Sequence, residues 1–322
     1  MGTQLGASAP SGFSPTAQGS DGDPVSPRRL GAVALTRDEL LALGATTITF
    51  ALLFAKPFNL LVRDWWNLPE AGHGLLLAPV AIWLCWRAGI RPNAKPQVAL
   101  GLAMLCVAVL LRFASGLAAE LFTMRASMVL ALGGLTVYRW GFRQLIHWWL
   151  PFALICLSIP LPELITQALA LPLQFKASRM GAALLEMRNV PVRLMGNVIL
   201  LPGRQLFVTE ACSGLRSITA LLSMAVLLGA LVLRSPFSRI GLVALAIPVA
   251  IVINGIRVFL TGFLVFFVSP SFGEGFMHMT EGWLLFLVSL SLLAGAAWLA
   301  TMLERRVMRP VPAMNGPEAS GR

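Results

Sequence analysis

The sequence predicts an all-α polytopic integral membrane protein with about eight transmembrane helices. Its 322 residues are 57% hydrophobic and only 12% charged, and the mean hydropathy is +0.77, which excludes a soluble globular protein. Apolar segments long enough to cross a bilayer recur along the chain and are separated by short basic clusters. A formal net charge of +11 in this pattern indicates orientation signals and no nucleic-acid partner.

The predicted spans follow a polar tail. Residues 1–36 are rich in Gly, Ser, Pro and Ala, so we expect a disordered cytoplasmic tail and not a cleavable signal peptide. A transmembrane domain over 37–306 and a second cytoplasmic tail over 307–322 complete the predicted organisation. The predicted spans are 40–61, 72–86, 97–116, 124–138, 145–161, 206–233, 240–268 and 283–303.

Lys and Arg residues between the spans predict the orientation. With eight spans, every second connection is basic and lies on the same side as the basic N-terminal tail, which places both termini in the cytoplasm. The clusters are Arg28, Arg29 and Arg37; Arg87, Arg91 and Lys95; Arg139 and Arg143; Arg234 and Arg239; and Arg305, Arg306 and Arg309.

The outer loop over 162–205 is predicted to be structured. Apolar positions recur at helical spacing over 163–188, which predicts an amphipathic helix lying at the membrane interface. Two strand-prone segments, 190–194 and 198–201, flank Gly196 and Asn197 and predict a small β-hairpin. The loop also holds five cations, which strains the positive-inside rule: Lys176, Arg179, Arg188, Arg193 and Arg204. Its role is either to shield helix ends or to dock a substrate.

Cys212 lies in a polar cluster at the mouth of a long apolar run. Its neighbours are Glu210, Ser213, Gly214 and Arg216. A thiol becomes a nucleophile as thiolate, and a helix N-terminus or a nearby cation lowers its pKa. The alternative is a buried cysteine that only packs. The four cysteines are widely spaced and form no paired ligand pattern, so we predict no disulfide framework, no metal site and no cofactor.

Arg257 interrupts the next apolar segment at the depth expected for Cys212. A charged residue inside a membrane span is costly and marks a functional site by default, and a guanidinium is suited to stabilise an oxyanion. Asn254 lies three residues earlier on the same helical face. It either orients the guanidinium or caps a broken helix.

His278 is predicted to lie in the outer loop before the last span, followed by Glu281 and Gly282. An imidazole there is suited to act as a base near neutral pH. His73, between two glycines at the outer start of the second span, is a secondary candidate for the same site. His147 precedes two tryptophans and is interpreted as part of an aromatic belt.

Three strings in this order resemble the exosortase/archaeosortase family: ACSGLR at 211–216, NGIR at 254–257 and HMTEG at 278–282. The resemblance extends to Trp65 and Trp66, to Gly72 through Leu75 and to the Gly196–Asn197 turn, and so covers most of 40–303. One departure is Gly72, where the family more often has Ser.

The resemblance implies a cysteine transpeptidase or protease in the bacterial inner membrane, with its site facing the periplasm. Its partners would be exported proteins with a C-terminal sorting tail made of a Pro-Glu-Pro-like motif, a transmembrane helix and a basic cluster. On this analogy Cys212 attacks the peptide carbonyl, Arg257 stabilises the oxyanion and His278 handles the protons. A thioester is then passed to water or to a surface glycan or lipid acceptor.

A non-catalytic component of exopolysaccharide export, or a transporter, is the rival interpretation, with Arg257 and Glu210 lining a pathway. A transporter favours polar groups near the bilayer midplane in repeated halves. Here the polar groups collect at one face, and this rival leaves Cys212 unexplained.

Overall fold

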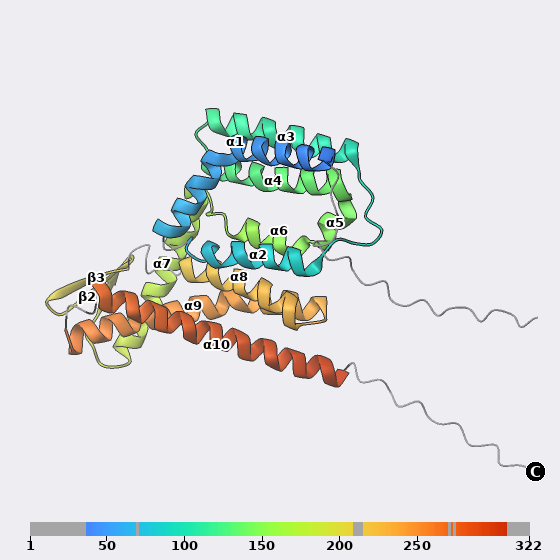
Figure 1. Cartoon of the computed structure of the whole chain (residues 1–322). Helices are drawn as coiled ribbons and strands as arrows, with labels where there is room; N and C mark the ends of the chain where they lie inside the picture. The colour runs from blue at the N-terminus through green and yellow to red at the C-terminus, as the bar shows by residue number, and fades with distance from the viewer. Residues whose placement is uncertain (1–36, 69–70, 209–214, 270–271, 273–274, 308–322) are drawn as a thin grey trace, which may run out of the picture.

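The computed structural model describes residues 37–68, 71–208, 215–269, 272 and 275–307, and this part of the chain is mostly helical. The helices are α1 (Arg37–Asn67), α2 (Gly74–Ala88), α3 (Val98–Leu117), α4 (Leu121–Trp140), α5 (Phe142–His147), α6 (Trp149–Leu157), α7 (Glu163–Glu186), α8 (Leu215–Val232), α9 (Pro236–Phe267) and α10 (Gly275–Val307). The strands are β1 (Arg193–Met195), β2 (Val198–Leu201) and β3 (Arg204–Phe207). The helices form an elongated bundle with the strands and α7 at one end, here called the sheet end (Figure 1).

Five of the described helices are long and apolar enough to cross a membrane, namely α1, α3, α4, α9 and α10. Helices α2 and α8 are apolar but shorter. The chain is therefore a multi-pass helical membrane protein, and the number of eight crossings stays a prediction.

The predicted span over 145–161 is divided between α5 and α6. The division lies at Trp148, whose indole N–H donates to Gly89 O at 3.0 Å. Pro151 in the first turn of α6 has no N–H to offer to an acceptor four residues earlier, which favours a helix start here over a continuous helix. Hydropathy alone could not detect this break.

The predicted span over 206–233 begins too early. Residues 204–207 form β3, which returns antiparallel to β2 through a turn at Pro202 and Gly203, where Gly203 has φ 73°. Helix α8 begins at Leu215.

The last predicted span begins too late. Helix α10 starts at Gly275, so His278 lies in its first turn and not in a loop. Residues 276–281 contain no Gly or Pro to prevent a helix from forming.

Three apolar clusters hold the bundle together. One joins α1, α3 and α4 around Phe54, Ala108 and Met128. A second joins α2, α6 and α8, and a third joins α8, α9 and α10. Helices α2 and α6 therefore lie between the first group and the α8–α10 group (Figure 1).

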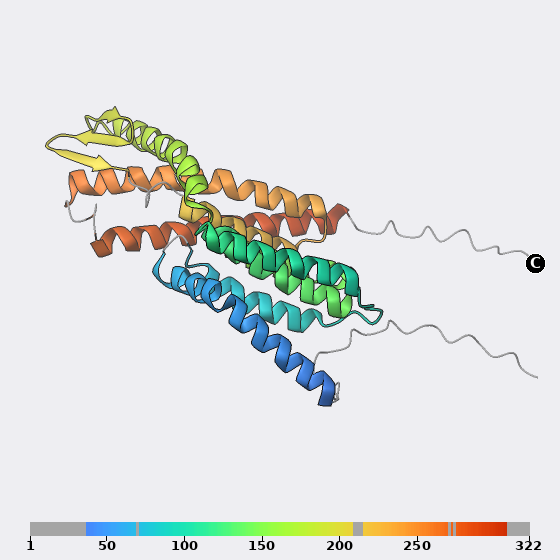
Figure 2. The same ribbon diagram turned by 90° about the horizontal axis from the view of Figure 1, so that it is seen from above.

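The strands form an antiparallel sheet in the order β1-β2-β3, packed on α7 and α9. The buried side of this unit includes Ile199, Leu201 and Val208, which cluster with Val258 and Val265 of α9. Helix α7 lies where we predicted an amphipathic helix. It buries a face of mostly small residues and leaves Leu164, Leu169 and Met187 exposed. Figure 2 shows α7 and the strands together at the sheet end from a second direction.

The opposite end of the bundle carries basic residues. Arg87 and Arg139 lie in the last turns of α2 and α4, Arg234 follows α8, and Arg305 and Arg306 lie in the last turn of α10. The carboxyl ends of these four helices lie at one end, here called the basic end (Figure 1). This arrangement agrees with the predicted alternation of basic connections.

At the sheet end, polar contacts fasten α4. Arg125 of α4 is buried and pairs with Asp64 of α1 at 2.5 Å. Glu120 caps α4 by accepting hydrogen bonds from the N–H groups of Phe122 at 2.9 Å and Thr123 at 2.6 Å. Burial raises the pKa of Glu120, but these bonds and Arg125 lower it further, so the net shift is downward.

We predict that Glu120→Gln lowers stability by about 0.5 to 2 kcal/mol near neutral pH, because the amide offers one acceptor oxygen and no charge. A lowered pKa in the folded state means that the carboxylate stabilises the fold above its ordinary pKa. The difference from wild type should shrink as pH falls through the lowered pKa. Thermal unfolding in detergent across a pH series would measure it, with the exposed Glu186→Gln as control.

Candidate functional site at the sheet end of helices α9 and α10

Three polar residues lie on one face of α9. Asn254, Arg257 and Thr261 are spaced by three and four residues, which places them one above another on the helix. Asn254 and Thr261 are buried, with 5% and 3% exposure, and Arg257 is partly buried. Helix α9 continues through Asn254 without a break, so the interpretation of this residue as a cap is wrong.

The Arg257 guanidinium lies directly against Gly282 of α10. A Cβ atom at Gly282 would lie 3.1 Å from Nη2 and 3.2 Å from Cζ of Arg257. Any other residue here would have to move the guanidinium or the helix. The contact therefore joins two of the three predicted motifs, NGIR and HMTEG.

A second polar contact joins α9 and α10 beside the first. The Thr261 hydroxyl donates to the Glu281 carboxylate, with Oγ1 at 2.9 Å from Oε2 and 3.1 Å from Oε1. Glu281 was predicted from the sequence, and Thr261 was not. The signal was present, because Thr261 continues the polar stripe of Asn254 and Arg257 by one helical turn.

The remaining predicted site residues are only partly described. Cys212, Glu210, Ser213 and Gly214 lie outside the described residues, as do the side chains of Arg216 and His278. The backbone of residue 278 lies in α10, four residues before Gly282. Residues four apart share a helical face, so position 278 is on the face of α10 that carries Gly282.

The chain that leads toward residue 212 is anchored by Asn197. Its side-chain N–H₂ donates to Val208 O at 3.2 Å and to Gln174 Oε1 at 3.4 Å, while Val208 N–H donates to Asn197 O at 2.9 Å. Val208 is buried and is the last described residue before 209–214. Asn197 therefore connects Val208 to the start of β2 and to Gln174 of α7. Neither Gln174 nor this role of Asn197 was predicted.

Close contacts through glycine hold α7 against α9 next to Arg257. A Cβ at Gly255 would lie 2.7 Å from Met180 Cε, and one at Gly181 would lie 2.5 Å from Val258 Cγ1. A Cβ at Gly262 would lie 2.9 Å from Leu185 Cδ1. These contacts set the position of α7, and with it the sheet, relative to the polar stripe of α9.

His73 lies at the N-terminus of α2, with Nε2 3.1 Å from Leu157 O. A carbonyl only accepts, so this contact needs the Nε2 proton. The nearby Trp65 indole donates to Ser158 O at 2.7 Å and packs where a Cβ at Gly74 would stand. These contacts fasten the α1–α2 connection to the end of α6. His147 has Nε2 3.2 Å from Ala88 O at the basic end.

Among the described residues, no group of three or more His, Cys, Asp or Glu side chains could hold a metal ion. The described cysteines, Cys85, Cys106 and Cys156, are free thiols.

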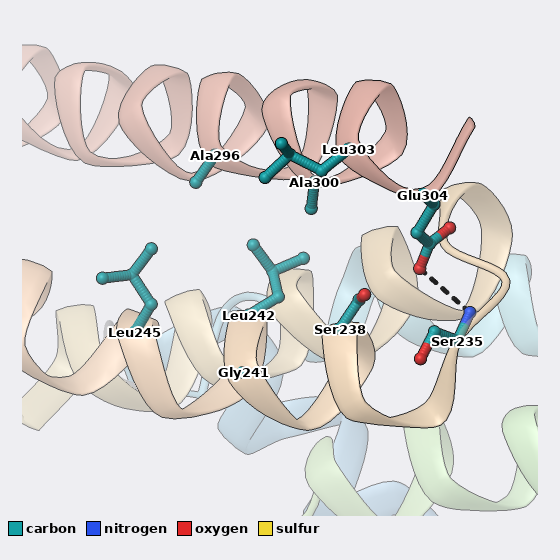
Figure 3. A pocket seen from close by; sticks show the side chains of 9 residues that line it. All are labelled: Ser235, Ser238, Gly241, Leu242, Leu245, Ala296, Ala300, Leu303 and Glu304. Atoms are coloured by element: carbon teal, nitrogen blue, oxygen red, sulfur yellow. Dashed lines mark hydrogen bonds between the residues drawn. The ribbon is translucent and has the colours of Figure 1, made fainter. Parts of the chain in front are cut away.

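A cavity of about 440 Å³ lies between α9 and α10 toward the basic end, away from this site (Figure 3). Glu304 closes one side by accepting from the N–H groups of Arg234 and Ser235, each at 2.9 Å. Gly282 precedes Glu304 by 22 positions in α10, or about 33 Å along the helix, which separates this cavity from Arg257.

The fold and this site define a multi-pass membrane protein with polar groups gathered toward one end of its bundle. The family model described as Transmembrane exosortase (Exosortase_EpsH) matches residues 65–295. The chain therefore belongs to the transmembrane exosortase family. No curated protein and no solved structure gives a significant match.

We predict that Asn197→Asp destabilises the α7–sheet unit, because it replaces the NH₂ group that donates to Val208 O and Gln174 Oε1 with a carboxylate oxygen, which cannot donate. Leaving these partly buried groups without a donor should cost about 1 to 3 kcal/mol. The exposed Asn189→Asp is a matched control, since Asp also tolerates the φ of 59° found there. Thermal unfolding in detergent would measure both, and equal stability of the two variants would contradict this role.

Proposed function

We propose that this exosortase is a membrane-embedded cysteine protease or transpeptidase that cleaves the C-terminal sorting tail of exported proteins. The observation that carries the proposal is the packing of the Arg257 guanidinium against Gly282. Gly282 lies four residues after position 278 in the same helix, α10. This packing brings together the motifs to which the proposal assigns the oxyanion donor and the proton carrier.

In the proposed reaction, the Cys212 thiolate attacks the carbonyl carbon of the scissile peptide bond and forms a C–S bond. Arg257 stabilises the negative charge that develops on the carbonyl oxygen. The C–N bond then breaks, and the imidazolium of His278 donates a proton to the leaving amine. Water or an acceptor nucleophile attacks the resulting thioester, loses a proton to His278 and releases the Cys212 thiolate.

Chain connectivity supports the participation of Cys212. Val208 lies four residues before it and Leu215 three residues after it, so Cys212 is expected within about 14 Å of the first and about 11 Å of the second. Val208 clusters with Val258, the neighbour of Arg257. Helix α8 packs against α9 and α10. Both described flanks of the Cys212 segment therefore pack on helices of the site.

We further propose that the chain crosses the bacterial inner membrane eight times, with the basic end in the cytoplasm and the sheet end in the periplasm. The basic ends of α2, α4 and α10, together with Arg234 after α8, support this orientation. The thioester would then form at the face where exported proteins emerge and where water is present.

Processing of a reporter that ends in a sorting tail would test the chemistry. Co-expressed Cys212→Ala should abolish cleavage. Arg257→Ala should slow it by about 10²- to 10³-fold, since one oxyanion donor is lost, and His278→Ala by about 10²- to 10⁴-fold. The membrane levels of all variants must match. Undiminished cleavage by Cys212→Ala would exclude the cysteine mechanism and leave the export-component interpretation.

The packing of Arg257 against Gly282 leads to a second prediction. Gly282→Ala removes no functional group, but its methyl must displace the guanidinium by a few tenths of an ångström. We expect processing to fall about tenfold, because small misplacements of a catalytic group are costly. Gly295→Ala in the same helix is the control, since nothing lies within 4 Å of its added methyl. Equal processing by the two variants would mean that the contact with Gly282 does not position Arg257.

A further inference from the structure

Strand β3 lies at the edge of the described sheet. The sheet order is β1-β2-β3, so β3 pairs with β2 on one side. Within the described residues, its other edge forms no backbone hydrogen bond. Helix α7 contacts β1 and β2. An unpaired edge is a template for an additional strand.

The alternation of an antiparallel ladder identifies which groups face this edge. Val208 N–H donates to Asn197 O, so Val208 forms a hydrogen-bonded pair with β2. Hydrogen-bonded and non-hydrogen-bonded pairs alternate along such a strand. The backbone N–H and C=O groups of Gln205 and Phe207 therefore point away from β2, toward the unpaired edge.

The side chains next to this edge are exposed. Phe207 is 58% exposed, and Gln205 is also exposed. Phe207 opposes Val198 of β2, and Val198 opposes Met195 of β1, which is 58% exposed as well. An apolar row thus crosses the outward face of the sheet and ends at β3.

The α7–sheet unit carries unneutralised positive charge. Lys176, Arg179, Arg188, Arg193 and Arg204 are all exposed, and none forms an ion pair within the described residues. Arg204 is the cation that β3 itself supplies, at the amino end of the strand. Cations in a segment predicted to be translocated oppose the positive-inside rule, so a function for them is expected.

We propose that the β3 edge binds an extended peptide that carries a carboxylate, as a fourth strand paired with the backbone of Gln205 and Phe207. This inference rests on the proposed function and assigns the binding surface for the segment that is cleaved. Main-chain pairing supplies affinity, Phe207 contacts an apolar side chain and Arg204 pairs with the carboxylate. Cys212 follows the end of β3 by five residues in the sequence, so the proposed nucleophile is expected within about 18 Å of this strand.

An anionic lipid would be attracted to the same charges but would not need a strand edge. A peptide next to β3 lies about 5 Å from its backbone and about 14 Å from β1, from the ordinary spacing of strands. Arg193 of β1 is therefore a cation of the same sheet that the proposed peptide does not reach. This difference separates pairing with a peptide from general attraction to a membrane.

The backbone test compares Gln205→Pro with Gln205→Ala. Both lose the same side chain, but only proline removes the outward N–H, and proline is tolerated at an edge position. Reporter cleavage should fall at least tenfold below that of Gln205→Ala. Thermal unfolding of both variants checks that the sheet is intact. Equal cleavage by the two variants would overturn the proposal.

The charge test uses a reporter tail with a single Glu before its transmembrane helix. Arg204→Glu should reduce cleavage about tenfold, and a reporter with Arg in place of that Glu should restore it. Arg193→Glu should leave cleavage within twofold. Equal losses from both variants, without recovery on the changed reporter, would indicate attraction to anionic lipid and overturn the role of Arg204.

A binding test separates this inference from the proposed chemistry. In a Cys212→Ala background, photoreactive benzoylphenylalanine replaces either Phe207 or Met195, and cross-linking to the same reporter is measured. The tail should cross-link at the first position at least fivefold more than at the second. Equal or absent cross-linking would overturn the β3 assignment, whereas cleavage by Cys212→Ala would overturn the chemistry alone.

Discussion

The site depends on the close approach of α9 to α7 and α10. Lipid tails are as apolar as leucine side chains, so helices in a bilayer associate mainly through packing, and small residues allow their backbones to come near. Gly255 and Gly262 on α9 and Gly181 on α7 lie where a Cβ would be less than 3.0 Å from an atom of the other helix, and a Cβ at Gly282 on α10 would press on the Arg257 guanidinium at 3.1 Å. These contacts place Arg257 between two helices that hydropathy alone would leave unconnected.

Two residues selected from the sequence lie at the contact between α9 and α10, whereas several of their neighbours were not predicted. Arg257 and Glu281 are polar residues in apolar segments, which is a signal that needs no tertiary information, and both lie at the α9–α10 contact. Thr261 was not predicted, because a single threonine in a span is ordinary unless its spacing from Asn254 and Arg257 is considered. Gln174 and Asn197 meet only after α7 and the sheet have packed, so no local pattern could relate them.

The incorrectly predicted spans likewise result from tertiary contacts that no local sequence pattern reveals. Leu206, Phe207 and Val208 are as apolar as residues of a membrane span. Leu206 and Phe207 nevertheless belong to a strand because they pair with β2, and Val208 continues this pairing by donating to Asn197 O. The break at Trp148 is stabilised by a hydrogen bond to Gly89, a residue 59 positions away. Hydropathy reports how well a segment tolerates lipid. It does not report which partners the segment finds.

The motif near residue 65 and the motifs near 257 and 282 serve different purposes, although all belong to the resemblance. Trp65, His73 and Gly74 join the α1–α2 connection to the end of α6, and the Asp64–Arg125 pair joins α1 to α4 beside them. These contacts build the frame. Arg257, by contrast, packs its guanidinium closely against Gly282 of the neighbouring helix. In the proposed reaction the guanidinium stabilises the negative charge that develops on the carbonyl oxygen, so a contact that fixes its position in advance reduces the reorganisation that the reaction needs.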